Sequence, residues 1–234
     1  MNMALKRSIC SAVGGLWVAL IATAGAQPAQ VIFNNSTNDL GVRFNPGTAE
    51  VGDQIKLGGD PAFRNLTLFT FEYWGTNTAN PSAFSGDVKA QVRFYLNDGV
   101  DFNTYASPGT KFWDSGLFDI NPTERSQLVF TGGTDFGGGA LVLPAEEFTW
   151  TVQFFGMDLT DSVGLDLYSP PTVGQDYPDY WSYNGSSWLL LTNQIGPMSF
   201  GATMSAVPEP SSMMLSLMGG TGLLLAAGRL RKRA

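Results

Sequence analysis

The sequence predicts an all-β protein, folded as a two-sheet β-sandwich of the jelly-roll kind. Apolar and polar residues alternate in several short segments, which is the period of a half-buried strand. The chain also contains 28 glycines and 13 prolines, which separate these segments as turns do. Residues 27–206 show no convincing helical period and no repeat of fixed length. Short strands punctuated in this way are typical of sandwiches.

The strands follow from the pattern in chain order. Residues 66–74 are apolar on both faces until Glu72, as in a central strand. In residues 88–96 and 148–154 every second residue is apolar, so we expect those side chains, including Trp150, to face the core. Shorter strands are predicted at 31–34, 54–57, 116–120, 127–131, 141–143, 163–168 and 198–205.

The dipeptide Asn184-Gly185 predicts a hairpin between strands at 180–183 and 186–191. Asn-Gly favours a two-residue turn because both of its residues adopt positive φ readily. Such a turn pairs Tyr183 with Ser186 and Trp181 with Trp188 on one face. If that face is outward, the two indoles are candidates for stacking on sugar rings; if it is inward, they belong to the core.

Charge argues against two classes of partner. The chain has 13 Lys and Arg against 20 Asp and Glu, and six of the basic residues lie near its two ends. Residues 27–206 keep 7 basic and 19 acidic residues, a net charge of −12. We therefore expect no nucleic-acid partner and no charge-driven binding of this part to anionic lipid, since both need clustered cations.

The residue types also limit the chemistry. There is no histidine, and the only cysteine is Cys10, so Ser-His-Asp and Cys-His systems, the usual zinc sites and internal disulfides are excluded. Glu146 and Glu147 are adjacent, so on a strand they point to opposite faces and cannot act as the carboxylate pair of a glycosidase. We expect no enzymatic activity, no cofactor and no metal centre.

A bound calcium ion is the alternative to a protein without a metal. Asp98, Asp101 and Asn103 gather after one predicted strand, and Asp158 and Asp161 flank another loop. Calcium takes such oxygen ligands, although neither group has the spacing of an EF-hand. Acidic turns of this kind also occur simply as solvated turns.

Residues 1–26 have the three parts of a secretory signal peptide. The basic pair Lys6-Arg7 precedes an apolar run over residues 9–22, and Ala24-Gly25-Ala26 closes the segment with small residues. This order predicts export and cleavage after Ala26. The alternative is an N-terminal membrane anchor.

Residues 207–234 form a second terminal segment. Pro208-Glu209-Pro210 comes first, and residues 211–228 follow as an uncharged, largely apolar stretch. Its 18 residues are near the lower limit for a helix that spans a bilayer. The chain closes with the basic residues Arg229, Arg231, Lys232 and Arg233, which would stay cytoplasmic.

This order of motif, apolar helix and basic end resembles the PEP-CTERM sorting signal. The resemblance implies recognition by an exosortase, a membrane-embedded processing enzyme of bacteria that make exopolysaccharide. The precursor would lie transiently in the inner membrane, and the part before the motif would then reach the cell envelope or the extracellular matrix. The alternative is a plain C-terminal membrane anchor.

Residues 27–206 are expected to form one β-sandwich domain. Stretches such as 50–55, 94–99, 108–110 and 148–152 resemble the uncharacterised domains that often precede this signal, which implies no activity. We therefore expect an exported envelope or matrix protein with a non-catalytic domain. The alternative is a carbohydrate-binding module that grips exopolysaccharide.

The tail gives the first test. If it is a sorting signal, Glu209→Ala, or deletion of residues 229–233, should leave precursor in the inner membrane. Cell fractionation, with an antibody against the predicted sandwich, measures this. An extracellular yield that is unchanged in both variants would contradict the sorting hypothesis.

Overall fold

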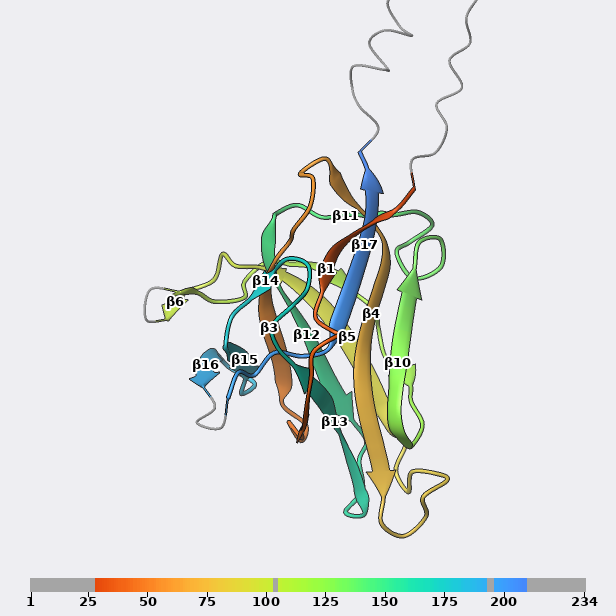
Figure 1. Ribbon diagram of the computed structural model, residues 1–234. Coiled ribbons are helices and arrows are strands. Elements are labelled where there is room, and N and C mark those ends of the chain that lie inside the picture. Colours follow the sequence, from red (N-terminus) through yellow and green to blue (C-terminus); the bar gives the residue numbers. More distant parts are fainter. Residues whose placement is uncertain (1–27, 103–104, 193–195, 210–234) are drawn as a thin grey trace, which may run out of the picture.

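The computed structural model describes residues 28–102, 105–192 and 196–209. These residues contain no helix and form two large antiparallel sheets packed face to face (Figure 1). The predicted all-β sandwich is thus confirmed. The expected signal peptide and apolar C-terminal helix lie outside the described residues, and within those residues no helix has the length and apolarity to cross a bilayer.

The first sheet, called sheet A, is built around the 15-residue strand β4 (Phe63–Asn77). Its strand order is β1 (Gln30–Asn34), β17 (Ala202–Pro208), β4, β13 (Asp161–Tyr168) and β2 (Asp39–Phe44). Two further strands pair with β4, namely β10 (Thr123–Thr131) and β11 (Leu141–Val142).

The second sheet, called sheet B, contains eight strands, and β12 and β3 lie at its centre. Its order is β16 (Trp188–Thr192), β15 (Asp179–Tyr183), β3 (Glu50–Lys56), β12 (Glu147–Phe155), β5 (Lys89–Leu96) and β8 (Lys111–Asp114). The short strands β14 (Gln175–Asp176) and β9 (Phe118–Asp119) pair with β3 and β5. Strands β6 (Asp101–Phe102) and β7 (Tyr105–Ala106) form a separate two-stranded sheet.

The core lies between the sheets and is rich in aromatic side chains. Phe148, Trp150, Val152 and Phe154 of β12 have no exposed surface, which confirms the inward face predicted for this strand. The ring centroid of Trp150 lies 5.4 Å from that of Phe69 in sheet A, in an edge-on arrangement. Since the domain has no disulfide, such apolar packing between the sheets supplies its main stabilisation.

Most predicted strands are present, and the differences lie at edges and ends. The sequence pattern missed β2 and β8, whose side chains are mostly exposed or half-buried and so alternate weakly. The strand predicted at 116–120 has only the two residues of β9. The last strand begins at Ala202 and continues past Ala206 to Pro208, so the sandwich extends two residues beyond the predicted boundary.

The predicted two-residue hairpin is wrong. Tyr183 pairs with Trp188, and Trp181 pairs with Leu190, so four residues connect β15 and β16. The side chain of Asn184 explains the difference, because its Oδ1 accepts hydrogen bonds from the backbone N–H groups of Ser186 and Ser187, each at 3.0 Å. This Asx-type turn adds two residues to the loop.

The two ends of the described chain leave the sandwich from the same end (Figure 1). Strands β1 and β17 are antiparallel neighbours, with Gln30 opposite Ala206. The end of β17 is held by Asn65, whose Nδ2 donates to the Pro208 carbonyl at 3.2 Å, and by Ala62, whose carbonyl accepts from Glu209 N at 3.0 Å. The described part of the predicted sorting motif, Pro208 and Glu209, is therefore attached directly to the sandwich.

One buried carboxyl interrupts the apolar core. Asp53 lies opposite Trp150 and has no exposed surface. Its Oδ2 accepts a hydrogen bond from Phe200 N at 3.1 Å, whereas its Oδ1 has no partner among the described residues. Burial, with a smaller effect from the nearby Asp176 carboxyl, raises the pKa of Asp53 well above its ordinary value.

Replacing Trp150 tests the importance of the packing between the sheets. Trp150→Ala should lower the free energy of unfolding by about 3–5 kcal/mol, because it leaves a cavity and removes the ring contacts to Phe69, Phe71 and Phe200. Trp150→Phe should cost less, since it keeps a ring and removes an indole N–H that has no partner among the described residues. Chemical denaturation measures both. An unchanged stability of Trp150→Ala would contradict the burial of this side chain.

Candidate functional site

The candidate site lies on the outer face of sheet B, which is the face turned away from the core. Thr149 and Thr151 of β12 alternate with the core residues and therefore point to this face. Glu50, Gly52 and Gln54 of β3 share it by register. Both threonines are nonetheless fully buried, so other side chains cover the middle of this face.

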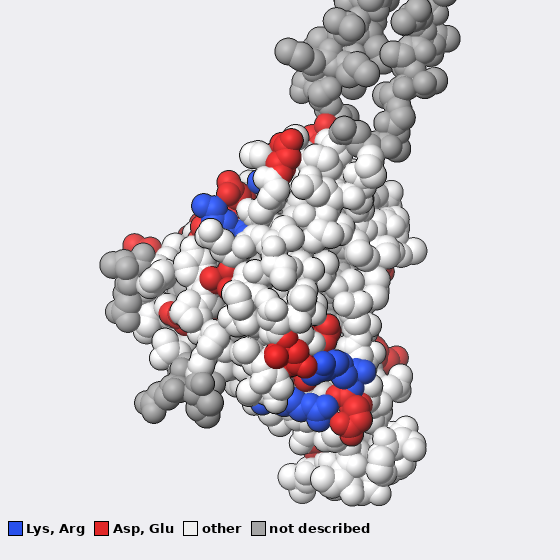
Figure 2. Space-filling model, in the orientation of Figure 1, with Lys and Arg blue, Asp and Glu red and all other residues white. Residues whose placement is uncertain are grey.

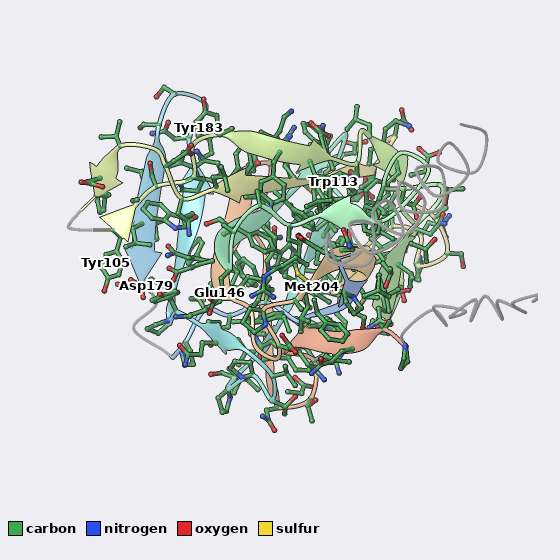
Figure 3. The ribbon with its side chains drawn as sticks, turned by 90° about the horizontal axis from the view of Figure 1, so that it is seen from above. Tyr105, Trp113, Glu146, Asp179, Tyr183 and Met204 are labelled. Carbon is green, nitrogen blue, oxygen red and sulfur yellow. The ribbon has the colours of Figure 1, made fainter. Side chains whose placement is uncertain are left out.

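A pocket of about 560 Å³ opens at one end of this face. Six of its lining residues have polar or aromatic side chains suited to binding: Gln54, Asn97, Asp98, Tyr105, Glu147 and Tyr177. They come from β3, β7 and β12 and from the segments that follow β5 and β14. Seen from above in Figure 3, Tyr105 lies on the same side of the molecule as Glu146 and Asp179, away from the core residue Met204.

A chain of hydrogen bonds fixes the polar side chains of the pocket. Trp181 Nε1 donates to Gln54 Oε1 at 3.3 Å, and Gln54 Nε2 donates to Glu147 Oε1 at 2.6 Å. The Tyr177 hydroxyl donates to the same Glu147 oxygen at 2.9 Å. Glu147 Oε2 accepts no hydrogen bond from the described residues, so it remains able to accept one from a ligand.

The tyrosines of the pocket add an aromatic surface. The ring of Tyr105, which is 43% exposed, lies edge-on to the ring of Tyr177, with centroids 6.3 Å apart. Burial and the hydrogen bond to Glu147 raise the pKa of Tyr177 to about 12. The phenol therefore stays protonated near neutral pH and continues to donate to Glu147.

Asn97 supplies an unused donor at the pocket wall. Its Oδ1 accepts a hydrogen bond from Thr149 Oγ1 at 2.8 Å. Its Nδ2 is buried and has no partner among the described residues. Buried donors are normally paired, so this nitrogen is an unsatisfied group of the fold, and it is too enclosed to contact a ligand in the pocket directly.

An aromatic cluster beside the pocket covers the middle of the face. Trp181 lies opposite Gly52, is fully buried, and contacts Phe102 edge-on at 6.4 Å. A Cβ on Gly52 would lie 2.6 Å from Thr151 Cγ2, so only glycine fits there. Trp188 is half-buried and lies 5.6 Å from Tyr95, measured between ring centroids.

The two tryptophans predicted as a pair therefore have different environments. The predicted pairing of Trp181 with Trp188 is wrong, as the register of the hairpin requires. Trp181 points to the outer face yet has no exposed surface, so it offers no plane on which a sugar could stack. Trp188 keeps some exposed surface, and its role in stacking remains a prediction.

A buried ion pair lies under the cluster. Arg93 Nη1 is 2.7 Å from Glu50 Oε2, and the two side chains are only 14% and 6% exposed. Glu50 Oε1 also accepts hydrogen bonds from Thr151 Oγ1 at 2.6 Å and from the Tyr95 hydroxyl at 3.1 Å. Burial and the neighbouring Glu50 raise the pKa of Tyr95. Arg93 therefore stays paired with Glu50, because separating the two would leave a buried charge without a partner.

Two of the acidic residues considered as calcium ligands, Asp98 and Asp161, have other partners. Asp98 accepts hydrogen bonds from the N–H and the hydroxyl of Thr110, at 2.6 and 2.7 Å. Asp161 accepts from the backbone N–H groups of Ser85, Gly86 and Asp158. Asn103 lies outside the described residues, and within them no group of three or more His, Cys, Asp or Glu is placed to hold a metal.

The structure describes only part of the terminal motifs. Pro208 ends β17 and Glu209 is exposed beside it. The remaining predicted positions lie outside the described residues: Ala24, Ala26, Pro210, Arg229, Arg231, Lys232 and Arg233.

Basic side chains do not form a continuous surface on the face shown in Figure 2, where they lie in small groups bordered by acidic ones. Arg43 and Arg125 both lie within ion-pair distance of the buried Asp166 carboxyl, at 3.6 and 3.4 Å. Arg125 also contacts Asp39 at 2.8 Å. These cations neutralise the sheet's own carboxylates.

Comparison with known proteins adds no assignment, since the chain matches no family model, no curated protein and no solved structure. The residues of the site and the terminal segments are therefore the features that bear on function.

We expect substitution of Trp181 and of Trp188 to lower the stability by different amounts. Trp181→Ala should lower the free energy of unfolding by about 3–5 kcal/mol, because it empties a buried site and removes the hydrogen bond to Gln54. Trp188→Ala should cost about 1–2 kcal/mol, since this ring is only partly removed from water. Thermal and urea unfolding report both. A larger loss for Trp188→Ala than for Trp181→Ala would contradict this assignment.

Proposed function

We propose that this protein is exported, sorted through its C-terminal segment, and retained in the cell envelope or extracellular matrix by a non-catalytic sandwich that binds polysaccharide. The observation that supports polysaccharide binding best is the pocket on the outer face of sheet B. There Tyr105 and Tyr177 lie beside Glu147, Gln54 and Asn97. This proposal joins the sorting function expected from the sequence with the alternative of a carbohydrate-binding module.

The chemistry of the pocket suits a sugar. Aromatic rings stack on the apolar C–H faces of pyranose rings, and a Tyr ring also offers a polar edge. Carboxylate groups bind hydroxyls, and here Glu147 Oε2 is the acceptor, because Gln54 and Tyr177 donate to the other oxygen. A single pocket of this kind gives a weak affinity, millimolar to high micromolar, or about 4–6 kcal/mol per site.

The carboxylates favour binding over hydrolysis. A glycosidase needs two carboxylates that flank the scissile bond, one as acid and one as base or nucleophile. The pocket lining contains Glu147 and Asp98, and Asp98 is already held by two hydrogen bonds from Thr110. We therefore assign the pocket a binding role.

Sorting rests on the terminal segments. The small residues Ala24 and Ala26, the motif Pro208-Glu209-Pro210 and the basic residues that follow Gly228 support export, followed by handling by an exosortase-type membrane enzyme. The two described chain ends leave the sandwich at the same end, which agrees with this route. A tail held in the membrane there would leave the opposite end of the sandwich exposed to solvent. A purely structural matrix protein is the competing function.

Substituting Tyr105 tests polysaccharide binding. Tyr105→Ala should weaken binding by about fivefold or more, the loss of one stacking contact of roughly 1 kcal/mol. The melting temperature should change little, because this ring is 43% exposed. The full chain, purified in a detergent without a sugar head group, would be run in native gels that contain soluble polysaccharides.

Tyr183→Ala is the matched control, since Tyr183 lies on the same face but does not line the pocket. It should keep the retardation of the wild type. If the wild-type protein, correctly folded, is retarded by none of a panel of neutral and acidic polysaccharides, the structural function is favoured and polysaccharide binding is rejected.

A further inference from the structure

The charges around the pocket bear on which sugars it can hold. We propose, resting on the polysaccharide-binding function above, that the pocket between Glu147, Tyr105 and Tyr177 takes uncharged sugar units and rejects uronic-acid units. Three features of the site point to this class of ligand. The lining is acidic, the nearest Lys and Arg side chains already form ion pairs, and one carboxylate oxygen of Glu147 is free to accept a hydrogen bond.

The lining carries negative charge only. Its titratable acids are Glu147 and Asp98, and no Lys or Arg lines the pocket. Glu147 lies on the wall with one oxygen already saturated by Gln54 and Tyr177. A sugar carboxylate that entered would therefore meet like charges, which repel it.

The cations on the neighbouring strands already have carboxylate partners of their own. Lys56 lies opposite Glu147 across the sheet, but its Nζ is 3.8 Å from a Glu146 oxygen. Lys111 forms an ion pair with Asp114, and Arg93 forms one with Glu50. A uronate-binding site would need at least one cation that is free to face the ligand, preferably an arginine that binds the carboxylate through two hydrogen bonds.

The open hydrogen-bonding capacity points the same way. Glu147 Oε2 can only accept, so its partner must donate. A sugar hydroxyl donates, whereas an ionised uronate carboxylate does not, so this position takes a hydroxyl and gives a carboxylate no favourable contact. A uronate unit keeps its ring hydroxyls but replaces the C6 hydroxyl of the neutral sugar with a group that cannot donate.

The test compares two polymers that differ only in charge, namely a polyuronate and its carboxyl-reduced form. Native-gel retardation of the full chain should show at least about tenfold tighter binding of the reduced form at low salt. The difference should shrink at about 0.5 M salt, because screening weakens the repulsion between exposed charges. Binding of the reduced form should change little with salt.

Glu147→Gln should reduce the difference in binding affinity between the two polymers. The amide keeps an oxygen that accepts from Gln54 and Tyr177, but it removes the negative charge. Glu124→Gln is the matched control: it removes an exposed charge from β10 of sheet A, outside the pocket lining, and should leave the difference in affinity unchanged. Circular dichroism and melting curves confirm that both variants are folded.

The outcomes separate the inference from the function on which it rests. Equal or tighter binding of the polyuronate by the wild type overturns the preference for uncharged sugars and leaves polysaccharide binding intact. The same preference in Glu147→Gln as in the wild type overturns the assignment to this pocket. Binding of neither polymer, nor of any neutral polysaccharide, rejects the proposed function itself.

Discussion

The contact on which the rest of this structure depends is the packing of Trp150 against Phe69 and Phe71 between the sheets, at centroid distances of 5.4 and 5.8 Å. A strand has a side-chain period of two, so fixing Trp150 in the core also fixes what its strand presents outside. Glu147, Thr149 and Thr151 face outward for this reason. A slip of one residue would bury Glu147 and expose the aromatic core, at a large cost in free energy. The core therefore sets the position of the pocket.

The outer face depends on this register in a second way. Gly52 has no side chain, and Trp181 lies opposite it, fully buried on a face that would otherwise be open to water. Trp181 then holds Gln54, and Gln54 holds Glu147, so the aromatic cluster orients the carboxylate of the pocket through two hydrogen bonds. Such support from neighbouring groups reduces the conformational entropy that a ligand must remove on binding.

The fold was largely predictable from sequence, whereas the pocket was not. Alternation in residues 88–96 and 148–154 depends on local pattern alone, and the structure places the apolar positions of both segments in the core, except Leu96, which is half-buried and lines the pocket. The two-residue hairpin was wrong because the Asn184 side chain accepts hydrogen bonds from two backbone N–H groups and lengthens the loop. The dipeptide Asn-Gly alone does not distinguish this loop from a two-residue turn. Gln54, Asn97 and Tyr177 are far apart in sequence, and strand order, which no local pattern gives, brings them to Glu147.

The end of β17 places a constraint on the proposed processing. The motif has no spacer before it, since Pro208 belongs to the strand and Glu209 N still donates to Ala62 of the sandwich. An enzyme embedded in the membrane must therefore act beside the folded sandwich or open the end of the strand. Opening breaks two hydrogen bonds, those of Pro208 and Glu209, and each contributes about 0.5–1.5 kcal/mol net. Strand ends fray at such energies while the core stays folded, so the sandwich and an accessible motif are compatible without a linker.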